Sequence, residues 1–445
     1  MVSIKHIKGW YAVHKWTSLI CSIFLLLMCI TGLPLIFLQE INDLSNEYNQ
    51  LVPKMSGNSY PFHPDQMAAA IQENYPNEKI HYIHFEDEKN STIFTLIPSG
   101  PEGNKASHKL IFNTSTAQVL EEVKPIARQG SDFLEWVKKV HYNLLAGAAG
   151  ELILAVMGLL FLVALLSGVM LYGPFSKTLP FGVIRKRGAP RNKWMDLHKL
   201  LGIVVLIWIT VVSVTGILLT MRFPIYNAWA KPVIDTVLLS YQGKLLPEKV
   251  VSLQEVINTI HGNLPDSRVD MIVYPGVPGN ASSYHYYVWA QGKTPLTEYL
   301  YTPVLVDAAT GQLTAVVKRP WYASVVGFSY PLHVGNYGGL PLKILWALLD
   351  LLTIGMLTSG VYGWIIRNKK NVSRPGEAQY TPIPQYPRSF RQIWGFPISI
   401  GIMTIIGLIS SLVGKGIWLW VSWIALTLPI VIAVWLGVVS WKGRR

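Results

Sequence analysis

Charged residues and cysteines are both scarce in this sequence of 445 residues. Only 14% of the residues are charged, whereas 51% are hydrophobic. A soluble protein has about a quarter charged residues, so the composition excludes an ordinary soluble domain. The only cysteines, Cys21 and Cys29, share one apolar run, so we interpret them as small packing residues and expect no disulfide framework. The sequence also has no Cys-x-x-Cys-His motif for covalent haem attachment and no Gly-x-Gly-x-x-Gly motif for a nucleotide.

Long apolar runs are abundant instead. A helix that spans a bilayer needs about 20 consecutive, mostly apolar residues. The first run is longer than a signal-peptide core and is not followed by a small-x-small cleavage site, so we expect an uncleaved anchor. The sequence therefore predicts a membrane α-helical bundle with six transmembrane helices, at about residues 17–38, 152–172, 200–220, 343–366, 395–413 and 416–440.

Basic residues set the expected orientation of these helices. Four segments, 1–16, 173–199, 367–394 and 441–445, hold 19 of the 38 Lys and Arg residues but only two acids. The positive-inside rule places them in the cytoplasm, and nucleic acid is not needed to explain the high pI. The expected order is the cytoplasmic N-terminus with the first span (1–38), an outer domain (39–140), a span (141–172), a cytoplasmic loop (173–199), a span (200–220), a second outer domain (221–342), a span (343–366), a cytoplasmic loop (367–394), a helical hairpin (395–440) and a cytoplasmic tail (441–445).

Two pairs of segments repeat each other along the chain. WYAVHKWTSLICSIFLLLMCITG from Trp10 and WMDLHKLLGIVVLIWITVVSVTG from Trp194 both place a His 17 residues before the Thr of a Thr-Gly pair. The segments that begin at His141 and His333 both place a Ser-Gly pair 26 residues after the His. A unit of helix, outer domain and helix thus occurs twice in one orientation, which predicts a parallel repeat. The terminal hairpin lies outside this repeat.

The two outer segments have the same coarse pattern of one helix followed by alternating strands. In the second segment, Ser252 is placed to cap a helix that has Glu255 at its third position. The turn DAATGQL from Asp307 joins two alternating runs, as in a β-hairpin. We expect two small α+β domains, each with one helix on an antiparallel sheet.

Four of the eleven histidines follow the duplication. A single histidine near a helix end is most often an interfacial residue, but four at duplicated spacings indicate a shared site. Two neutral imidazoles that face each other inside a bundle suit the axial positions of a haem iron, whereas a structural zinc site needs four ligands. The sequence therefore predicts one pair near each membrane face, with haem iron bound by His14 with His198 and by His141 with His333.

Small and basic residues near these histidines are further candidates for cofactor contacts. Glycine lets a flat macrocycle approach a helix, a hydroxyl can bond backbone or a propionate, and a base can neutralise a propionate. Ordinary helix packing and cytoplasmic anchoring are the alternative explanations. The packing candidates are Thr31, Gly32, Thr215, Gly216, Ser167, Gly168, Ser359 and Gly360. The propionate candidates are Lys15, Lys199, Lys139 and Arg222.

The duplicated segments resemble the PepSY-associated transmembrane family. The resemblance lies in WYAVHKWTSL (from Trp10), LLAGAAGELIL (from Leu144), WMDLHKLLG (from Trp194) and PLHVGNYGGLPLK (from Pro331), and it covers about residues 5–366. It implies two periplasmic PepSY domains in an inner-membrane protein linked to iron uptake. Similar members include ferrisiderophore reductases with two b-type haems, which implies haem ligation by the four histidines. The segment NTSTAQV departs from the family's Asp-x-x-Thr-Gly turn, so no role of that turn is carried over to the first outer domain.

Our first functional hypothesis is a haem-dependent ferric-chelate reductase of the bacterial inner membrane. Two bis-His b-type haems would pass electrons outward to a ferric siderophore or another ferric chelate, and reduction weakens a hard-oxygen chelate and releases Fe(II). Because no nucleotide motif is present, a membrane quinol or a separate cytoplasmic reductase must supply the electrons. The alternatives are a non-enzymatic siderophore-binding or transport component, with Asp350 as the nearest ion-coupling candidate, and a PepSY-type regulator of a periplasmic protease.

Overall fold

The chain divides into two compact units, which are described separately. The bundle unit comprises residues 1–37, 136–220 and 329–445, and the sheet unit comprises residues 38–135 and 221–328. Much of the predicted loop 367–394 and part of the predicted tail 441–445 lie outside the described residues. The computed structural model describes residues 4–45, 64–86, 90–98, 107–115, 119–123, 132–177, 179–185, 189–280, 282–368, 388–414 and 416–442.

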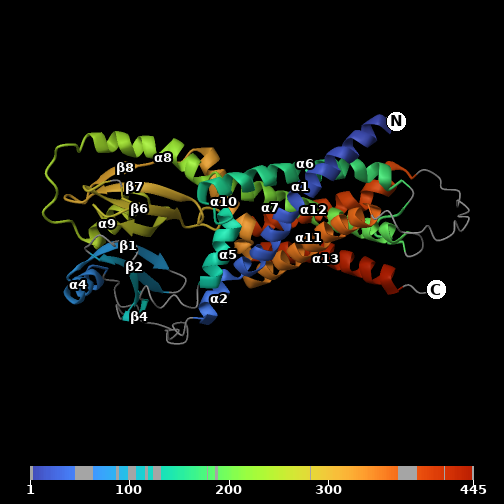
Figure 1. The fold of residues 1–445 in the computed structure, drawn as a ribbon. Coiled ribbons are helices and arrows are strands. Elements are labelled where there is room, and N and C mark those ends of the chain that lie inside the picture. The colour runs from blue at the N-terminus through green and yellow to red at the C-terminus, as the bar shows by residue number, and fades with distance from the viewer. Residues whose placement is uncertain are drawn as a thin grey trace, which may run out of the picture. The chain divides into compact units, whose positions relative to one another are not determined.

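Four long helices form the centre of the bundle unit. α1 (Ile4–Ile36) packs against α6 (Gly147–Phe175) and α11 (Gly339–Asn368). α7 (Pro190–Thr220) packs against the same two helices, so the four close a ring in which α1 lies across from α7. Figure 1 shows these helices running side by side. The ring places residues of α1 and α7 opposite each other in the bundle interior.

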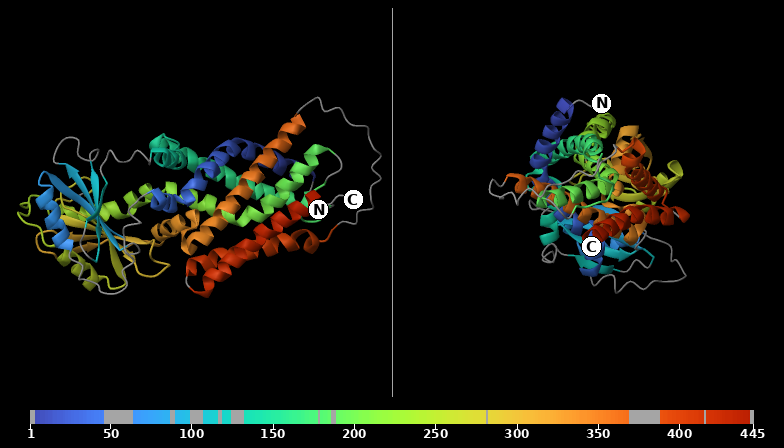
Figure 2. Two further views of the ribbon diagram at one scale, coloured as in Figure 1. Left: turned by 90° about the horizontal axis from the view of Figure 1, so that it is seen from below. Right: turned by 90° about the vertical axis from the view of Figure 1, so that its right-hand side faces the viewer.

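A helical hairpin packs on one side of this ring. α12 (Phe390–Val413) and α13 (Ile417–Lys442) contact each other and also contact α7 and α11 (Figure 2). Ser389 and Gln392 form a capping box at the start of α12, which fixes where the helix begins. In the described part of the chain, six helices are long and apolar enough to span a membrane, which confirms the prediction of a multi-pass membrane protein with six spans.

Two short helices lead into α6 and α11. α5 (Asp132–Asn143) is followed by a bend in which Leu144 has a φ of 52°. α10 (Trp321–Val334) ends at Gly335, whose φ is 75° and where a Cβ atom would lie 2.7 Å from the Trp346 ring. Only glycine fits such a left-handed position against a bulky neighbour. These bends place the ends of α5 and α10, which carry two of the predicted ligands, beside the spans that follow.

The sheet unit contains one antiparallel sheet of eight strands in the order β4-β3-β2-β1-β5-β6-β7-β8. Its helices are α2 (Leu38–Ser45), α4 (Pro64–Asn74), α8 (Arg222–Leu239) and α9 (Leu253–Asn263). The strands are β1 (Glu78–Glu86), β2 (Ser91–Pro98), β3 (His108–Asn113), β4 (Val119–Val123), β5 (Ser267–Val273), β6 (His285–Gly292), β7 (Tyr301–Asp307) and β8 (Leu313–Val316).

Helices cover both faces of this sheet. Side chains of α4 and α9 share a core with Val304 and Val306 of β7, whereas side chains of α8 pack with the intervening Leu305. Successive strand residues point to opposite faces, so α4 and α9 lie on one face and α8 lies on the other. The predicted hairpin around Asp307 is confirmed, because β7 and β8 pair antiparallel through that turn.

The two outer segments are joined more closely than their sequences indicate. We expected two small α+β domains, each with its own antiparallel sheet, and the structure joins their strands into one sheet, because β1 of the first segment pairs antiparallel with β5 of the second, with Ile83 opposite Ile272. The predicted cap at Ser252 is confirmed, since its side chain accepts a hydrogen bond from the Glu255 amide. Asp65 of α4 also accepts hydrogen bonds from the first two amides of α9. Pairing removes an exposed edge from each half-sheet, which accounts for the single sheet.

Candidate functional site

His14 of α1 and His198 of α7 face each other inside the bundle. Their ring centroids are 6.2 Å apart, and the ring planes make an angle of 59°. The Nδ1 atom of His14 lies 2.9 Å from the Ala164 carbonyl of α6, and Nδ1 of His198 lies 2.8 Å from the Met356 carbonyl of α11. We call these two residues the His14 pair. Each ring is thus fixed by a helix that neighbours its own.

His141 of α5 and His333 of α10 form a second pair with nearly the same geometry. Their ring centroids are 6.3 Å apart at an angle of 61°. Nδ1 of His141 lies 2.9 Å from the Thr31 hydroxyl of α1, and Nδ1 of His333 lies 3.0 Å from the Val212 carbonyl of α7. We call these residues the His141 pair. The two predicted pairs therefore come together in the structure, each within the bundle unit.

The hydrogen bonds at Nδ1 fix the protonation of the rings. A carbonyl can only accept, so each ring that faces one donates its Nδ1 proton and keeps a lone pair on Nε2. His141 follows this pattern because the Thr31 hydroxyl donates its own proton to the Leu27 carbonyl and so accepts the Nδ1 proton. No described residue forms a hydrogen bond to Nε2 of any of the four rings. Metal-bound histidines have this arrangement, in which the second nitrogen donates to a carbonyl or carboxylate.

The Ser-Gly and Thr-Gly pairs contact the histidines directly. A Cβ atom added to Gly168 would lie 3.2 Å from Cε1 of His14, and one added to Gly360 would lie 2.9 Å from Cε1 of His198. The corresponding distances are 3.3 Å from Gly32 to His141 and 3.0 Å from Gly216 to His333. The sequence placed these glycines against a cofactor, whereas the structure places each against the edge of an imidazole ring. They provide the space in which each ring lies.

The hydroxyl groups of the same motifs bond to their own helices. Ser167 donates to the Ala164 carbonyl and Ser359 donates to the Met356 carbonyl, at 2.9 and 2.8 Å. These two carbonyls are the acceptors of the His14 pair. Thr31 and Thr215 bond backward in the same way, to Leu27 and Val211. Each hydroxyl is therefore hydrogen-bonded within the helical turn that contacts a histidine ring.

The separation of the two rings in each pair fits two imidazoles that would bind one metal ion. A metal–imidazole bond of about 2.0–2.1 Å, with about 1 Å more from the nitrogen to the ring centre, places the two centroids roughly 6 Å apart. The observed separations of 6.2 and 6.3 Å agree with this value. With Nδ1 engaged in all four rings, Nε2 is the nitrogen available as ligand. The donor set of two neutral imidazoles suits a haem iron.

The predicted propionate contacts have other partners in the structure. The Lys199 ammonium lies 3.1 Å from the Asp196 carboxylate. Lys15 lies over the Trp16 ring at 4.3 Å. Lys139 is exposed, and Arg222 belongs to α8 of the sheet unit, where it lies over Phe223. Their contact with a cofactor therefore stays a prediction.

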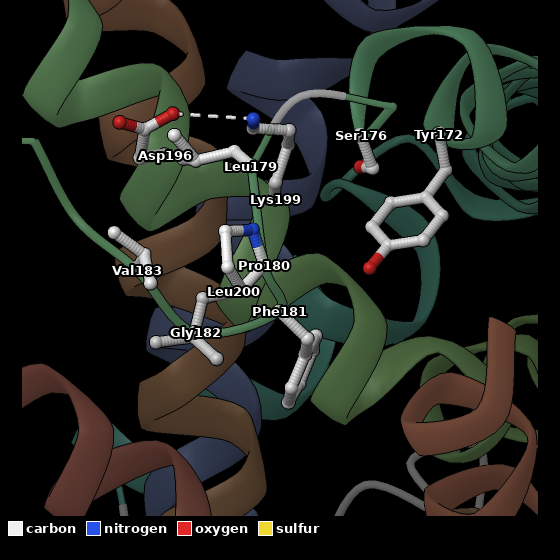
Figure 3. Close-up of a pocket in the computed structure, with 10 residues that line it drawn as sticks. All are labelled: Tyr172, Ser176, Leu179, Pro180, Phe181, Gly182, Val183, Asp196, Lys199 and Leu200. Carbon is white, nitrogen blue, oxygen red and sulfur yellow. Dashed lines mark ion pairs between the residues drawn. The ribbon is translucent and has the colours of Figure 1, made fainter. Parts of the chain in front are cut away.

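The sequence did not single out Asp196, which organises the region next to His198. Its side chain is fully buried and pairs with the Arg185 guanidinium at 2.7 Å as well as with Lys199. Figure 3 shows Asp196 and Lys199 at a small pocket bordered by the segment from Leu179 to Val183. These ion pairs hold the loop before α7 against the turn that carries His198. The available sequence signal was a single acid in the otherwise basic segment 173–199.

The comparison with known protein families agrees with these motifs. A family model described as the PepSY-associated TM region matches residues 11–367. The match contains both histidine pairs and all four glycines that contact them. A search of curated proteins found no match to the chain. Because the family model covers most of the sequence, the protein belongs to the PepSY-associated TM region family.

Proposed function

We propose that this membrane protein is a dihaem oxidoreductase that passes electrons across the bacterial inner membrane to a ferric chelate, such as a ferrisiderophore, on the periplasmic side. The observation that carries the proposal is the matched geometry of the two histidine pairs. One b-type haem is assigned to the His14 pair and one to the His141 pair. A bound haem would supply a one-electron carrier at each position.

The chain's own residues prepare both positions. The carbonyl groups of Ala164, Met356 and Val212 hold the Nδ1 protons of His14, His198 and His333, so Nε2 remains free to bind iron. The glycines set how closely each ring edge approaches the neighbouring helix. The apolar helices of the bundle exclude water, which favours neutral imidazoles. Binding therefore needs little rearrangement of these side chains.

The spacing of the pairs supports electron transfer through the membrane. His14 and Gly32 of the Thr31-Gly32 motif that holds His141 are 18 residues apart on α1, which is about 27 Å at the helical rise. Two macrocycles of haem size would occupy much of that path. The shared spacings and the symmetric strand order of the sheet support a parallel duplication as the origin of the two sites.

The distribution of basic residues and the chemistry of iron chelates indicate the proposed substrates. The basic segments assign the His14 pair to the cytoplasmic side and the His141 pair to the periplasmic side. One electron converts Fe(III) in a chelate to Fe(II), and oxygen ligands hold Fe(II) more weakly. A membrane quinol or a cytoplasmic reductase is the proposed donor, because the sequence has no nucleotide motif.

Electron transfer across a sealed membrane tests this function. The purified protein is placed in lipid vesicles with a reductant trapped inside, and a ferric hydroxamate chelate and an Fe(II)-specific dye are added outside. We expect dye colour to form with the wild-type protein and to fall to the protein-free level in His14→Ala. His261→Ala, which changes an exposed histidine of α9, is the control and should retain the rate. Equal rates in all three would contradict the proposal and favour a binding or transport role.

A further inference from the structure

Asp350 is a buried carboxyl group in the middle of α11 that the histidine pairs do not use. Its side chain is 7% exposed, and its Oδ2 atom has no hydrogen-bond partner among the described residues. The other acids of the six helices lie near helix ends, with Glu151 five residues into α6 and Asp196 in its ion pairs near the start of α7. An ionisable side chain in the middle of a membrane-spanning helix costs free energy, so such a residue is a candidate for a functional role.

Cys29 of α1 is the group that contacts this carboxyl. It is 8% exposed, and its thiol lies close enough to Asp350 to interact with the carboxyl group. A thiol is a weak donor without charge, so it cannot neutralise a carboxylate. Within a low-dielectric bundle, an ionised carboxylate needs a positive charge nearby or must bind a proton.

Most other titratable residues of the surrounding helices lie toward the ends of those helices, whereas Asp350 lies in the middle of α11. In α7 they end at Lys199, and in α12 and α13 they lie near the ends, at Arg391 and Lys442. Lys343 lies two turns before Asp350 on the same face of α11, and it is buried with a partner of its own. In α6, Glu151 and Tyr172 lie toward opposite ends. Among the described residues, Cys29 is the titratable group whose interaction with Asp350 the structure shows.

The Asp350–Cys29 contact lies between the two histidine pairs. Asp350 is six residues from Met356, the acceptor of His198, which is about 9 Å along the helix. Cys29 lies two residues before Thr31, whose hydroxyl is 2.9 Å from Nδ1 of His141. The carboxyl group is therefore placed to respond to a change of charge at either pair, because a charge acts over such distances in a bundle interior.

We propose that Asp350 takes up one proton from water when one electron enters the bundle, and releases it to water when the electron leaves for the ferric chelate. This inference rests on the proposed function. Electron entry removes one positive charge from the interior, which destabilises the carboxylate and favours its protonated form. The donor supplies the electron, the chelated Fe(III) accepts it, and the Asp350 carboxyl gains and loses only the proton. Asp350 thus balances the charge of the electron with a proton, and it does not bind the haem iron.

Redox titration of the purified, haem-loaded protein at several pH values tests the role of Asp350. We expect at least one midpoint potential to fall as pH rises, by up to about 59 mV per tenfold change in proton concentration for one proton per electron. Asp350→Asn should remove this dependence, and Asp350→Glu should restore it. Glu151→Gln, the same chemical change near the start of α6, is the matched control and should keep it.

Infrared difference spectroscopy gives a second measurement that identifies the carboxyl group. The reduced-minus-oxidised spectrum should contain a protonated-carboxyl band in the wild type and in Glu151→Gln, and the band should be absent from Asp350→Asn. A dihaem protein with pH-independent potentials, or with an unchanged band and slope in Asp350→Asn, would overturn this inference alone. A protein that binds no haem would overturn the proposed function as well.

Discussion

At the scale of single residues, the histidines are positioned by small neighbours on other helices. His14 lies against Gly168 of α6 and His198 against Gly360 of α11, so each ring of this pair is held by a helix that carries neither ligand. The same crossed arrangement holds for Gly32 and Gly216. A short Ser-Gly or Thr-Gly motif therefore combines a carbonyl acceptor with space for a ring.

Gly360→Ala tests this positioning. The added Cβ would lie 2.9 Å from both Cε1 and Nδ1 of His198, so the ring must move. Overpacking of this kind costs about 1–3 kcal/mol, which corresponds to roughly 5- to 150-fold weaker retention of the haem at the His14 pair. The haem-to-protein ratio after gel filtration measures the loss.

Gly202→Ala is the control for that change. It adds the same methyl group to α7, where the nearest atom is Met356 Sδ at an ordinary 3.7 Å. The control should retain both haems. Equal haem content in the two variants would show that Gly360 does not position His198.

At the scale of elements, the β1–β5 pairing unites the two outer segments. His84 of β1 and Asp270 of β5 form an ion pair across this junction at 3.6 Å. The interaction with the Asp270 carboxylate raises the pKa of His84, and burial of the ring opposes the increase. The junction therefore contains one interaction that depends on pH.

The sign of this dependence follows from the raised pKa. The pair stabilises the junction fully below the ordinary histidine pKa of about 6.5, and the stabilisation is lost as pH rises through the raised value. Because the His84 side chain is 36% exposed, we expect less than about 1 kcal/mol. Amide protection factors of β1 and β5 from hydrogen exchange, corrected for intrinsic rates, should fall between about pH 6 and about pH 8.

His84→Gln should remove the pH-dependent part of this protection. His261→Gln, at an exposed position of α9, should leave it unchanged. Protection that increases with pH in the wild-type protein, or the same decrease in His84→Gln, would show that another group governs the junction.

At the scale of the whole molecule, local patterns and non-local contacts differ in how well sequence predicts them. The six spans follow from apolar length, and the histidine pairs follow from repeated spacing. The neighbouring helix that each histidine ring packs against cannot be predicted in this way, because the spacing of His14 along α1 carries no information about Gly168 of α6. The single sheet was also missed, since the patterns of Ile83 and Ile272 fit an edge strand and a central strand equally well.

The contact between Asp350 and Cys29 illustrates the same limit. Each residue was visible in the sequence, Cys29 as a packing residue and Asp350 as an isolated acid. Only the packing of α1 against α11 brings them together. Buried polar contacts between distant segments are set by the tertiary fold, so they cannot be derived from the periodicity of either helix.

The central claim is that two histidine pairs each hold one haem, and haem stoichiometry tests it most directly. Wild-type protein, His14→Ala and His141→Ala are produced under haem-replete conditions, and the reduced-minus-oxidised visible spectrum is measured against protein concentration. We predict two low-spin b-type haems per chain in the wild type and one in each variant, with the remaining haem differing between the two. A colourless wild-type protein, or loss of both haems from either single change, would contradict the account.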